Sequence, residues 1–307
     1  MNHPASQRRV TVLKGGHGSE RDVSLRTGAA CAAALRSIGH IVQEVDATRD
    51  ALQALNPADM DVVFLAMHGD AGEDGRVQGF LEILGVPYTG SGVLASALAM
   101  DKIQSKRVFA AAAVATPRWS VWDGDLASEA APRPPVVIKR SMEGSSVGVT
   151  IATTADDVIA AAASAGRGML LCEELIAGRE CTVAVLDGDV LGVLEIVTRD
   201  GRYDYETKYH RTDNEYRVLA VDGPDAAMVQ ACSVQAARAY GALNCRGMAR
   251  VDVMVDERGP WVLEVNTLPG MTATSLVPKI AAALGWSFET LVARMLDSAR
   301  LDDGGHS

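Results

Sequence analysis

The amino-acid sequence predicts an α/β protein, α+β overall, that is built from more than one domain. Near the N-terminus, strand-like apolar segments alternate with segments of helical periodicity, which is typical of a parallel sheet covered by helices. Farther along, strand-like segments follow one another across short turns, which favours antiparallel hairpins. The chain has 307 residues, of which 48% are hydrophobic, so it can bury more than one sizeable core.

The first third of the chain shows a βαβ rhythm. A helix at 22–38 is expected between the first two strands, and the sheet is therefore expected to be parallel. A later helix should begin at Lys102, because Asp101 is a favoured N-cap residue. The strands expected in this part are 9–14, 41–45 and 61–67, and the other helices are 76–84, a segment from about 92, and 102–113.

The rest of the chain contains more strands and one long loop. The segments 181–185 and 190–197 are expected to pair as strands across the turn 187–189. The polar stretch 198–217 has no clear period and is predicted to be a lid loop. The other elements expected here are strands at 136–139 and 169–174, and helices at 156–165, 225–241 and 287–300.

The segment 250–266 is expected to form a hairpin that carries polar residues along one face. Arg250 and Asp252 alternate with valines in its first strand, and Glu264 and Asn266 alternate with apolar residues in its second. Alternate residues of a strand point to the same face. Two carboxylates and an amide oxygen in one patch suit Mg²⁺. The alternative is a solvated sheet face with cross-strand ion pairs.

The length of the hairpin loop decides which of these side chains meet. A three-residue loop at 257–259, with Gly259 in the left-handed conformation, places Asp252 opposite Glu264. A four-residue loop would slip the register and separate them. A turn rich in glycine and proline, 267–272, follows directly, so the polar face of the hairpin is expected to end beside this turn.

The composition argues against several classes of function. The formal net charge of −10 argues against general binding to nucleic acid or to anionic membranes, which requires basic patches. Five scattered cysteines without a CxxC pair indicate reduced thiols rather than a zinc site or a disulfide framework. The N-terminus lacks an apolar signal region, and no apolar run reaches the ~18 residues of a membrane span. A cytoplasmic protein is therefore expected.

A glycine- and serine-rich loop at 141–148 follows a strand that ends in Lys139. Such a loop lets backbone N–H groups approach phosphate oxygens, and the lysine adds a cation beside them. The spacing matches neither a Walker A motif nor a dinucleotide-binding fingerprint. An ordinary flexible turn is the alternative interpretation.

Other charged residues carry weaker signals, each with a plain alternative. Lys102 lies in the first turn of a helix, where a solvated lysine is the usual interpretation. The Lys208-Tyr209 pair lies in the long loop and could swing into a site. The strand end at 173–176 could face a base and Glu180 could hold a ribose, or both could form a polar strand exit. Glu20 could anchor an amine, or could stabilise the helix dipole as a first-turn acid.

Taken in order, these segments resemble the ATP-grasp superfamily, with a phosphate loop, a base-binding strand end, a lid lysine and a metal hairpin. Further motifs resemble the D-alanine–D-alanine ligase family, and the resemblance extends from about residue 9 to 297. They are Lys14-Gly-Gly-His-Gly-Ser-Glu20, Met67-His-Gly69, Gly72-Glu-Asp-Gly75, Tyr88-Thr-Gly-Ser-Gly92, Ala99-Met-Asp-Lys102, Glu143-Gly-Ser-Ser-Val-Gly148, Tyr203-Asp-Tyr-Glu-Thr-Lys-Tyr209, Arg250-Val-Asp-Val-Met254, Glu264-Val-Asn-Thr-Leu-Pro-Gly-Met271 and Ser275-Leu-Val-Pro278.

The resemblance implies a three-domain ATP-grasp architecture. An N-terminal domain, 1–99, would hold a Rossmann-like parallel sheet on the first-substrate side. A central subdomain, 100–180, would carry the phosphate loop 142–148. A C-terminal subdomain, 181–307, would carry the lid loop 198–217 and the metal hairpin 249–266. The family often forms homodimers through its N-terminal domain, so a homodimer is also implied.

The resemblance further implies a ligase that forms a carbon–nitrogen bond between two D-alanines with ATP and Mg²⁺, for peptidoglycan precursor synthesis. The first carboxylate is phosphorylated, and the second amine attacks the acyl phosphate. Two Mg²⁺ ions, which Mn²⁺ can replace, would be held by Asp252, Glu264 and Asn266. The residues implied to contact ATP are Lys102, Lys139 and Lys208 at the phosphates, Glu173, Glu174, Leu175 and Ile176 at the adenine, and Glu180 at the ribose.

The resemblance assigns the remaining site residues to the two amino acids. Glu20 would bind the first ammonium and would hydrogen-bond with Ser145 and Tyr209, with His68 near the same subsite. Arg250 and the Gly270 N–H would stabilise the oxyanion of the tetrahedral intermediate. The second carboxylate would be received by Ser275 and Leu276.

Two departures from the family pattern keep alternatives open. Arg140 stands where proline usually follows the lysine, and 210–221 lacks the usual exit from the lid. A ligase with another amino acid or a peptide as acceptor is therefore one alternative. A nucleotide-binding scaffold without catalytic activity is another, although the intact lysines, Arg250 and the hairpin acids argue against it.

Overall fold

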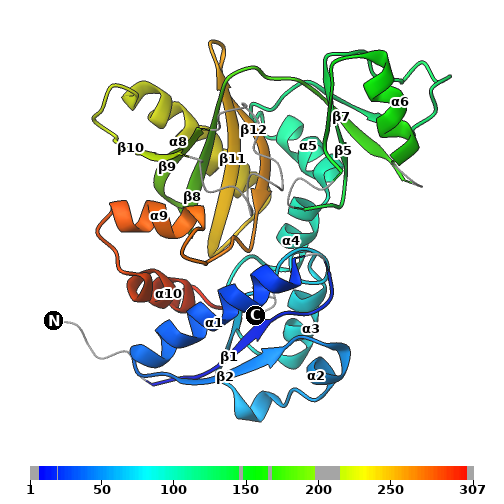
Figure 1. The fold of residues 1–307 in the computed structure, drawn as a ribbon. Coiled ribbons are helices and arrows are strands. Elements are labelled where there is room, and N and C mark those ends of the chain that lie inside the picture. Colours follow the sequence, from blue (N-terminus) through cyan, green and yellow to red (C-terminus); the bar gives the residue numbers. More distant parts are fainter. Residues whose placement is uncertain (1–6, 19, 145–147, 165–167, 198–214, 303–307) are drawn as a thin grey trace.

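The computed structural model describes residues 7–18, 20–144, 148–164, 168–197 and 215–302. Its strands form three separate sheets, with the orders β2-β1-β3, β4-β7-β5-β6 and β10-β9-β8-β11-β12. The first sheet lies at one end of the molecule, and the other two lie side by side at the opposite end (Figure 1). This is the mixed α/β architecture that the sequence predicts.

The N-terminal sheet is parallel, as predicted. β1 pairs with β2 on one side and with β3 on the other, both in parallel. Val10, Val12 and Leu13 of β1 are almost completely buried, because helices and loops cover both faces of the sheet. The elements of this part are β1 (Arg9–Lys14), α1 (Arg21–Ser37), β2 (Ile41–Asp46), α2 (Arg49–Gln53), a 3₁₀ turn η1 (Pro57–Asp59), β3 (Val62–Leu65) and α3 (Arg76–Leu84).

Two helices, α4 (Val93–Met100) and α5 (Lys102–Ala111), lead from the N-terminal part to the rest. The predicted cap at Asp101 is confirmed, because its carboxylate accepts hydrogen bonds from the backbone N–H groups of Ile103 and Gln104 at 3.0 and 3.2 Å. The next sheet is antiparallel, with β7 between β4 and β5. Its elements are β4 (Trp119–Trp122), β5 (Val136–Arg140), β6 (Thr150–Ala152), α6 (Ala155–Ser164) and β7 (Leu170–Glu174).

The five-stranded sheet is also antiparallel and contains the hairpin of β11 and β12. One prediction is wrong here: residues 215–217, expected in the lid loop, belong to strand β10, which pairs with β9. The elements are β8 (Arg179–Leu186), β9 (Asp189–Val197), β10 (Glu215–Leu219), α8 (Ala226–Ala242), β11 (Met248–Asp256), β12 (Gly259–Asn266), α9 (Leu276–Ala283) and α10 (Phe288–Asp297).

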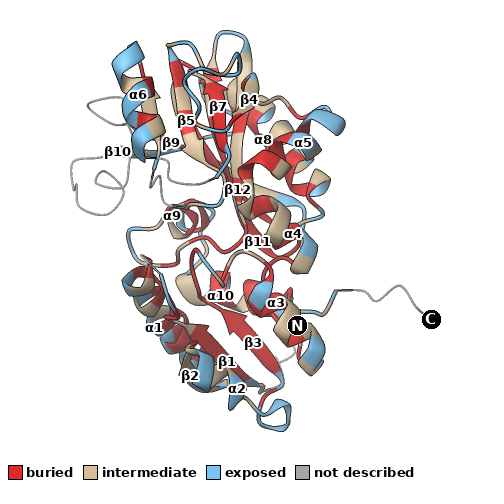
Figure 2. Ribbon diagram, turned by 90° about the vertical axis from the view of Figure 1, so that its right-hand side faces the viewer, coloured by how far each residue is buried: buried red, intermediate tan, exposed pale blue. Residues whose placement is uncertain are grey.

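The C-terminal end of the chain returns to the N-terminal sheet. Helix α10 packs against α1, and the backbone N–H of Arg300 donates to the carbonyl of Tyr88. One buried cluster joins apolar residues of α1 and β1 to those of β9, α9 and α10. The N-terminal sheet and the five-stranded sheet therefore share one apolar cluster, and Figure 2 shows buried ribbon in the elements that contribute to it.

Within the described ranges, no single helix is long and apolar enough to cross a membrane. Helices α9 and α10 would qualify only as a pair, and they meet at a bend of 105°.

Candidate active site

The predicted pairing in the hairpin is confirmed. Arg250 lies opposite Asn266, and Asp252 lies opposite Glu264. The predicted three-residue loop is wrong, because Asp256 pairs with Gly259 and leaves a two-residue turn. A bulge between Asp252 and Val253 shifts the register by one residue and restores the predicted alignment at the far end of the hairpin.

The Asp252 side chain of the hairpin accepts several hydrogen bonds. Its carboxylate accepts two hydrogen bonds from the Arg250 guanidinium, at 2.9 and 2.8 Å. It also accepts one from the Thr182 hydroxyl at 2.7 Å and one from the Asn266 amide at 3.1 Å. These hydrogen bonds fix the position of the Asp252 carboxylate. Because the Asn266 amide nitrogen donates to it, the amide oxygen of Asn266 is directed away from it.

Lys102 connects the hairpin to the glycine-rich loop. Its ammonium lies 3.1 Å from the carboxylate of Glu264 and donates to the carbonyl of Glu143 at 2.7 Å. The backbone N–H of Lys102 donates to the carbonyl of Ser141, which is the first residue of the loop. Lys102 is only 9% exposed, so the alternative of a solvated lysine is wrong.

A buried trio of charges lies behind the loop. Glu173 of β7 has one carboxylate oxygen 2.6 Å from the ammonium of Lys106 and the other 2.5 Å from that of Lys139. Burial opposes ionisation of Glu173, but the two lysines lower its pKa to about 2. Burial tends to lower the pKa of Lys139, yet Glu173 and Glu264 raise it overall. Glu173 and Lys139 thus stay charged at neutral pH, while burial lowers the pKa of Lys106 against the opposing effect of Glu173.

Lys106 was not identified from the sequence. It is completely buried, and its ammonium also contacts the Thr116 hydroxyl at 2.5 Å and the Val262 carbonyl at 3.1 Å. The one available signal was its position four residues after Lys102, which puts both lysines on one side of α5. At the same strand end, the Glu174 carboxylate pairs with Arg118 and Arg258 at 2.9 Å each.

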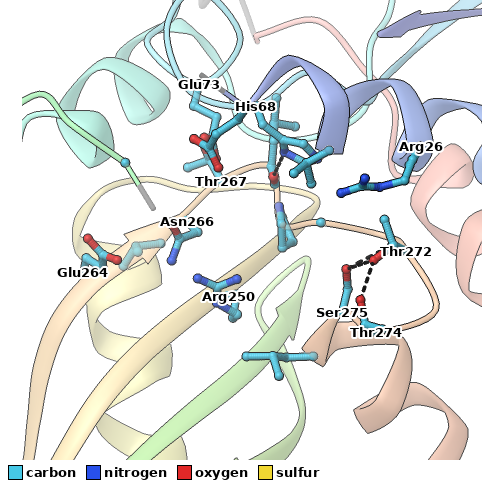
Figure 3. Close-up of a pocket in the computed structure, with 18 of the residues that line it drawn as sticks. Arg26, His68, Glu73, Arg250, Glu264, Asn266, Thr267, Thr272, Thr274 and Ser275 are labelled. Atoms are coloured by element: carbon cyan, nitrogen blue, oxygen red, sulfur yellow. Dashed lines mark hydrogen bonds between the residues drawn. The ribbon is translucent and has the colours of Figure 1, made fainter. Parts of the chain in front are cut away.

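A cavity of about 760 Å³ opens between the hairpin, the turn that follows it and the N-terminal part of the chain. Figure 3 shows Glu264 and Asn266 at one side, Arg250 in the middle, and Ser275 and the neighbouring threonines at the other side. The predicted site residues that line it are Glu20, His68, Lys102, Arg250, Glu264, Asn266, Gly270, Ser275 and Leu276. Ser145, Lys208 and Tyr209 lie outside the described residues.

Glu20 lies where the N-terminal part meets the glycine-rich loop. A Cβ atom placed on Gly144 of the loop, or on Gly69, would lie 3.0 Å from its carboxylate oxygen. At the other side of the cavity, a Cβ atom on Gly270 would lie 3.0 Å from the Ser275 hydroxyl. That hydroxyl accepts a hydrogen bond from the Thr272 N–H at 3.0 Å, just before α9 begins at Leu276.

Glu73 is a second acid in the cavity that had no predicted role. Its carboxylate accepts a hydrogen bond from the Gly69 N–H at 2.7 Å. Desolvation and the neighbouring Glu20 carboxylate raise the pKa of Glu73 to about 8. The motif Gly72-Glu-Asp-Gly75 contributed to the family resemblance, but nothing in its spacing indicated that Glu73 faces Glu20.

The hairpin residues fit a hard divalent cation by type, although their number is small. In the described parts of the chain, no group of three or more His, Cys, Asp or Glu side chains is placed to hold a metal ion. The set here is the two carboxylates of Asp252 and Glu264 with the amide oxygen of Asn266. All three supply oxygen, which Mg²⁺ prefers, and phosphate oxygens can complete such a set.

This combination of three sheets, a glycine-rich loop beside a buried lysine and an acidic hairpin defines an ATP-grasp protein. The C-terminal model of the D-Ala D-Ala ligases matches residues 123–297, and the N-terminal model of the same family matches 42–91. The chain therefore belongs to the D-alanine–D-alanine ligase family.

Individual relatives agree with this assignment. A D-alanine–D-alanine ligase of Syntrophotalea carbinolica is 45% identical, with 96% of this chain and 97% of the relative covered. One from Stutzerimonas stutzeri is 46% identical, with 95% and 94% covered. The crystal structure of the Bacillus anthracis ligase complexed with ATP is 32% identical and superposes with a TM-score of 0.81, covering 96% of this chain and 97% of that one.

Lys106→Met should destabilise the protein by roughly 3 kcal/mol or more, because it breaks a buried ion pair and leaves Glu173 short of compensating charge. Urea unfolding at pH 7 measures this loss. Arg107→Met is the matched control, since Arg107 is exposed on the same helix and should change stability by only about 0.5 kcal/mol. Equal effects of the two substitutions would contradict the role of the trio.

Glu73→Gln should change how stability depends on pH. Because the folded pKa of Glu73 is about 8 and its ordinary value is 4.5, the folded state binds the extra proton between these values. Wild-type stability therefore falls through this window as pH rises, and the variant should lack that part of the decline. Thermal unfolding from pH 5 to 9 measures the difference, with exposed Glu129→Gln as control. Parallel pH curves for Glu73→Gln and wild type would refute the assignment.

Proposed function

We propose that this protein joins two D-alanines to D-alanyl-D-alanine with ATP, through a D-alanyl phosphate, for peptidoglycan precursor synthesis. One observation carries the proposal: a single cavity contains an acidic anchor, a central arginine and a hairpin of oxygen ligands. These are the three things the reaction needs, namely a site for an ammonium, a group that stabilises an oxyanion, and a site for a metal-bound phosphate.

ATP is proposed to bind between the two antiparallel sheets. Lys102 and Lys139 would contact its phosphates, and their fixed positions support this because phosphoryl transfer depends on placed positive charge. Lys208 of the lid is proposed to reach the γ-phosphate. The strand end from Glu173 through Glu174 and Leu175 to Ile176 would face the adenine, with Glu180 at the ribose. The relative from Bacillus anthracis, whose structure contains ATP, supports this nucleotide.

Asp252, Glu264 and Asn266 are proposed to hold two Mg²⁺ ions, or Mn²⁺ in their place. When bound, the ions would neutralise phosphate charge and align the transferred phosphoryl group. In the present geometry Lys102 compensates Glu264 and Arg250 compensates Asp252. Each acid therefore has a compensating cation before the ions arrive.

The first D-alanine would place its ammonium at Glu20, with Glu73 nearby. The Glu20 carboxylate would attract the ammonium, and Glu73, whose pKa is raised to about 8, would be mostly protonated beside it at neutral pH. Ser145 and Tyr209 are proposed to complete this subsite. The D-alanine carboxylate oxygen then forms a bond to the γ-phosphorus, the bond to the bridging oxygen breaks, and ADP leaves.

The second D-alanine would bind with its carboxylate at Ser275 and Leu276. Its amine nitrogen, after loss of a proton, attacks the carbonyl carbon of the acyl phosphate. Arg250 and the Gly270 N–H would stabilise the resulting oxyanion. The oxyanion collapses, the carbon–oxygen bond to phosphate breaks, and phosphate leaves with the dipeptide formed.

Three coarser features accompany the proposal. The chain is proposed to divide into domains at 1–99, 100–180 and 181–307, and the three sheets support this division, with β8 beginning two residues before the last boundary. Closure of a lid formed by 198–214, which lie outside the described residues, would exclude water from the acyl phosphate. A homodimer in the cytoplasm, where ATP is available, is proposed as the working state.

The test is product analysis with purified protein, ATP and Mg²⁺. Phosphate release should depend on D-alanine, and mass spectrometry should detect about one D-alanyl-D-alanine for each phosphate. L-alanine is the matched control and should give no release above background. A panel of other D-amino acids as second substrate tests the alternative acceptors. Absence of phosphate release that depends on D-alanine would reject the proposal.

Glu264→Gln should lower kcat by at least about 100-fold, because a neutral amide is a poor ligand for Mg²⁺ and leaves phosphate charge uncompensated. Steady-state kinetics at several Mg²⁺ concentrations measure the loss. Glu257→Gln, in the exposed turn of the same hairpin, should leave kcat within about twofold of wild type. Wild-type kcat in Glu264→Gln would remove the hairpin from the site.

A further inference from the structure

The turn that carries Gly270 is held by the N-terminal part of the chain rather than by its own hairpin alone. One ring nitrogen of His68, Nδ1, lies 3.0 Å from the carbonyl oxygen of Leu268. Both residues are buried, and they are 200 positions apart in sequence. A hydrogen bond therefore crosses from the segment after β3 to the turn after β12.

Thr27 of helix α1 holds the other side of the same assembly. Its hydroxyl oxygen lies 3.1 Å from Nε2 of His68 and accepts a hydrogen bond from the backbone N–H of Met271 at 3.3 Å. Thr27 is 1% exposed, so water does not compete for these contacts. The Thr27 hydroxyl thus contacts Met271, which follows Gly270, and His68. His68 in turn contacts Leu268, two residues before Gly270.

The directions of these hydrogen bonds follow from chemistry. A carbonyl oxygen only accepts, so Nδ1 of His68 must carry the proton that is donated to Leu268. In a neutral ring Nε2 then accepts, and its donor is the Thr27 hydroxyl. That leaves lone pairs on the Thr27 oxygen for the Met271 N–H. Each group has a suitable partner, which is the condition for a stable buried polar network.

We propose that Thr27 is a positioning residue of this reaction: with His68 it clamps the 268–271 turn so that the Gly270 N–H points at the developing oxyanion. The inference rests on the proposed function and deepens it. His68 then acts through the turn and not as an acid or base, since both of its ring nitrogens are committed to protein groups. Oxyanion donors act only when they are held in place before the reaction, and the clamp supplies that restraint.

The charges around His68 are compatible with a neutral ring. Burial lowers its pKa, which Glu20 opposes and Arg250 reinforces. Among the described residues, Glu73 is a further titratable group near Glu20. The clamp therefore keeps one protonation state at neutral pH.

The ratio of phosphate released to dipeptide formed distinguishes the proposed positioning role of Thr27 from a general structural role. Formation of the acyl phosphate creates no oxyanion on the acyl carbon, but attack by the second amine does. A misplaced Gly270 N–H should therefore slow dipeptide formation more than phosphoryl transfer. The acyl phosphate then escapes or reacts with water, which returns D-alanine and phosphate.

The experiment compares Thr27→Val with wild type in the presence of ATP, Mg²⁺ and D-alanine. Phosphate released per dipeptide should rise from about one to above two, and dipeptide kcat should fall about tenfold, with the KM for ATP within about twofold. Thr27→Ser keeps the hydroxyl and should stay near one phosphate per dipeptide. Thr11→Val, a buried threonine of β1 away from the turn, is the control for loss of a hydroxyl.

An unchanged ratio in Thr27→Val, whatever its overall rate, would overturn the inference. So would a raised ratio in Thr11→Val. If wild-type protein forms no dipeptide at all, the proposed function fails first, and the kinetic comparison is replaced by a direct observation of the ring.

That observation is the ¹⁵N spectrum of His68 in the wild-type protein, assigned by the signal that disappears in His68→Gln. A neutral ring protonated at Nδ1 at pH 7 is expected. A ring protonated at Nε2, or a charged ring, would overturn the clamp. This measurement needs no enzymatic activity, and it applies even if Thr27→Val does not fold.

Discussion

The pairing of Asp252 with Glu264 across β11 and β12 is the constraint on which the rest of the site depends. Side chains in a sheet alternate with a period of two, so a slip of one residue would send every hairpin ligand to the apolar face. The two-residue turn alone would shift the pairing by one residue. The bulge between Asp252 and Val253 shifts it back, so Asp252 still lies opposite Glu264. Arg250, Asp252, Glu264 and Asn266 therefore share one face, and the following turn begins at the mouth of the cavity.

The second constraint is compensation of buried charge. Lys102 pairs with Glu264, Arg250 with Asp252, and Lys106 and Lys139 with Glu173. An isolated buried charge would be too costly to keep ionised, whereas paired charges can remain ionised and fixed. One of these pairs, Lys102 with Glu264, joins a cation proposed to contact phosphate with an acid proposed to hold metal. If metal and nucleotide bind together, Glu264 would pair with the metal ion and Lys102 with a phosphate. Neither charge would then be left without a partner.

Much of this arrangement could be predicted from sequence, and the exceptions have physical reasons. The parallel N-terminal sheet and the cap at Asp101 follow from local periodicity and residue type. The hairpin alignment was predicted correctly but from the wrong loop, because a bulge leaves no signal in the pattern of alternation. Short elements such as α2 and β6 have too few residues to show a period. Lys106, Glu73 and Thr27 gain their meaning only from partners on other elements, which spacing along one chain cannot reveal.

The cavity is lined both by the hairpin of the five-stranded sheet and by the N-terminal part, so the proposed chemistry would depend on both. The hairpin carries the residues proposed to hold the metal ions, but the turn that follows it has no regular secondary structure of its own. The N-terminal part supplies the acid at Glu20 and grips the turn through His68 and Thr27. In the proposed reaction, substrate anchoring and oxyanion placement would therefore both depend on the N-terminal part of the chain. Loss of the contacts of His68 and Thr27 would then disturb the oxyanion donor while leaving the acid at Glu20 in place.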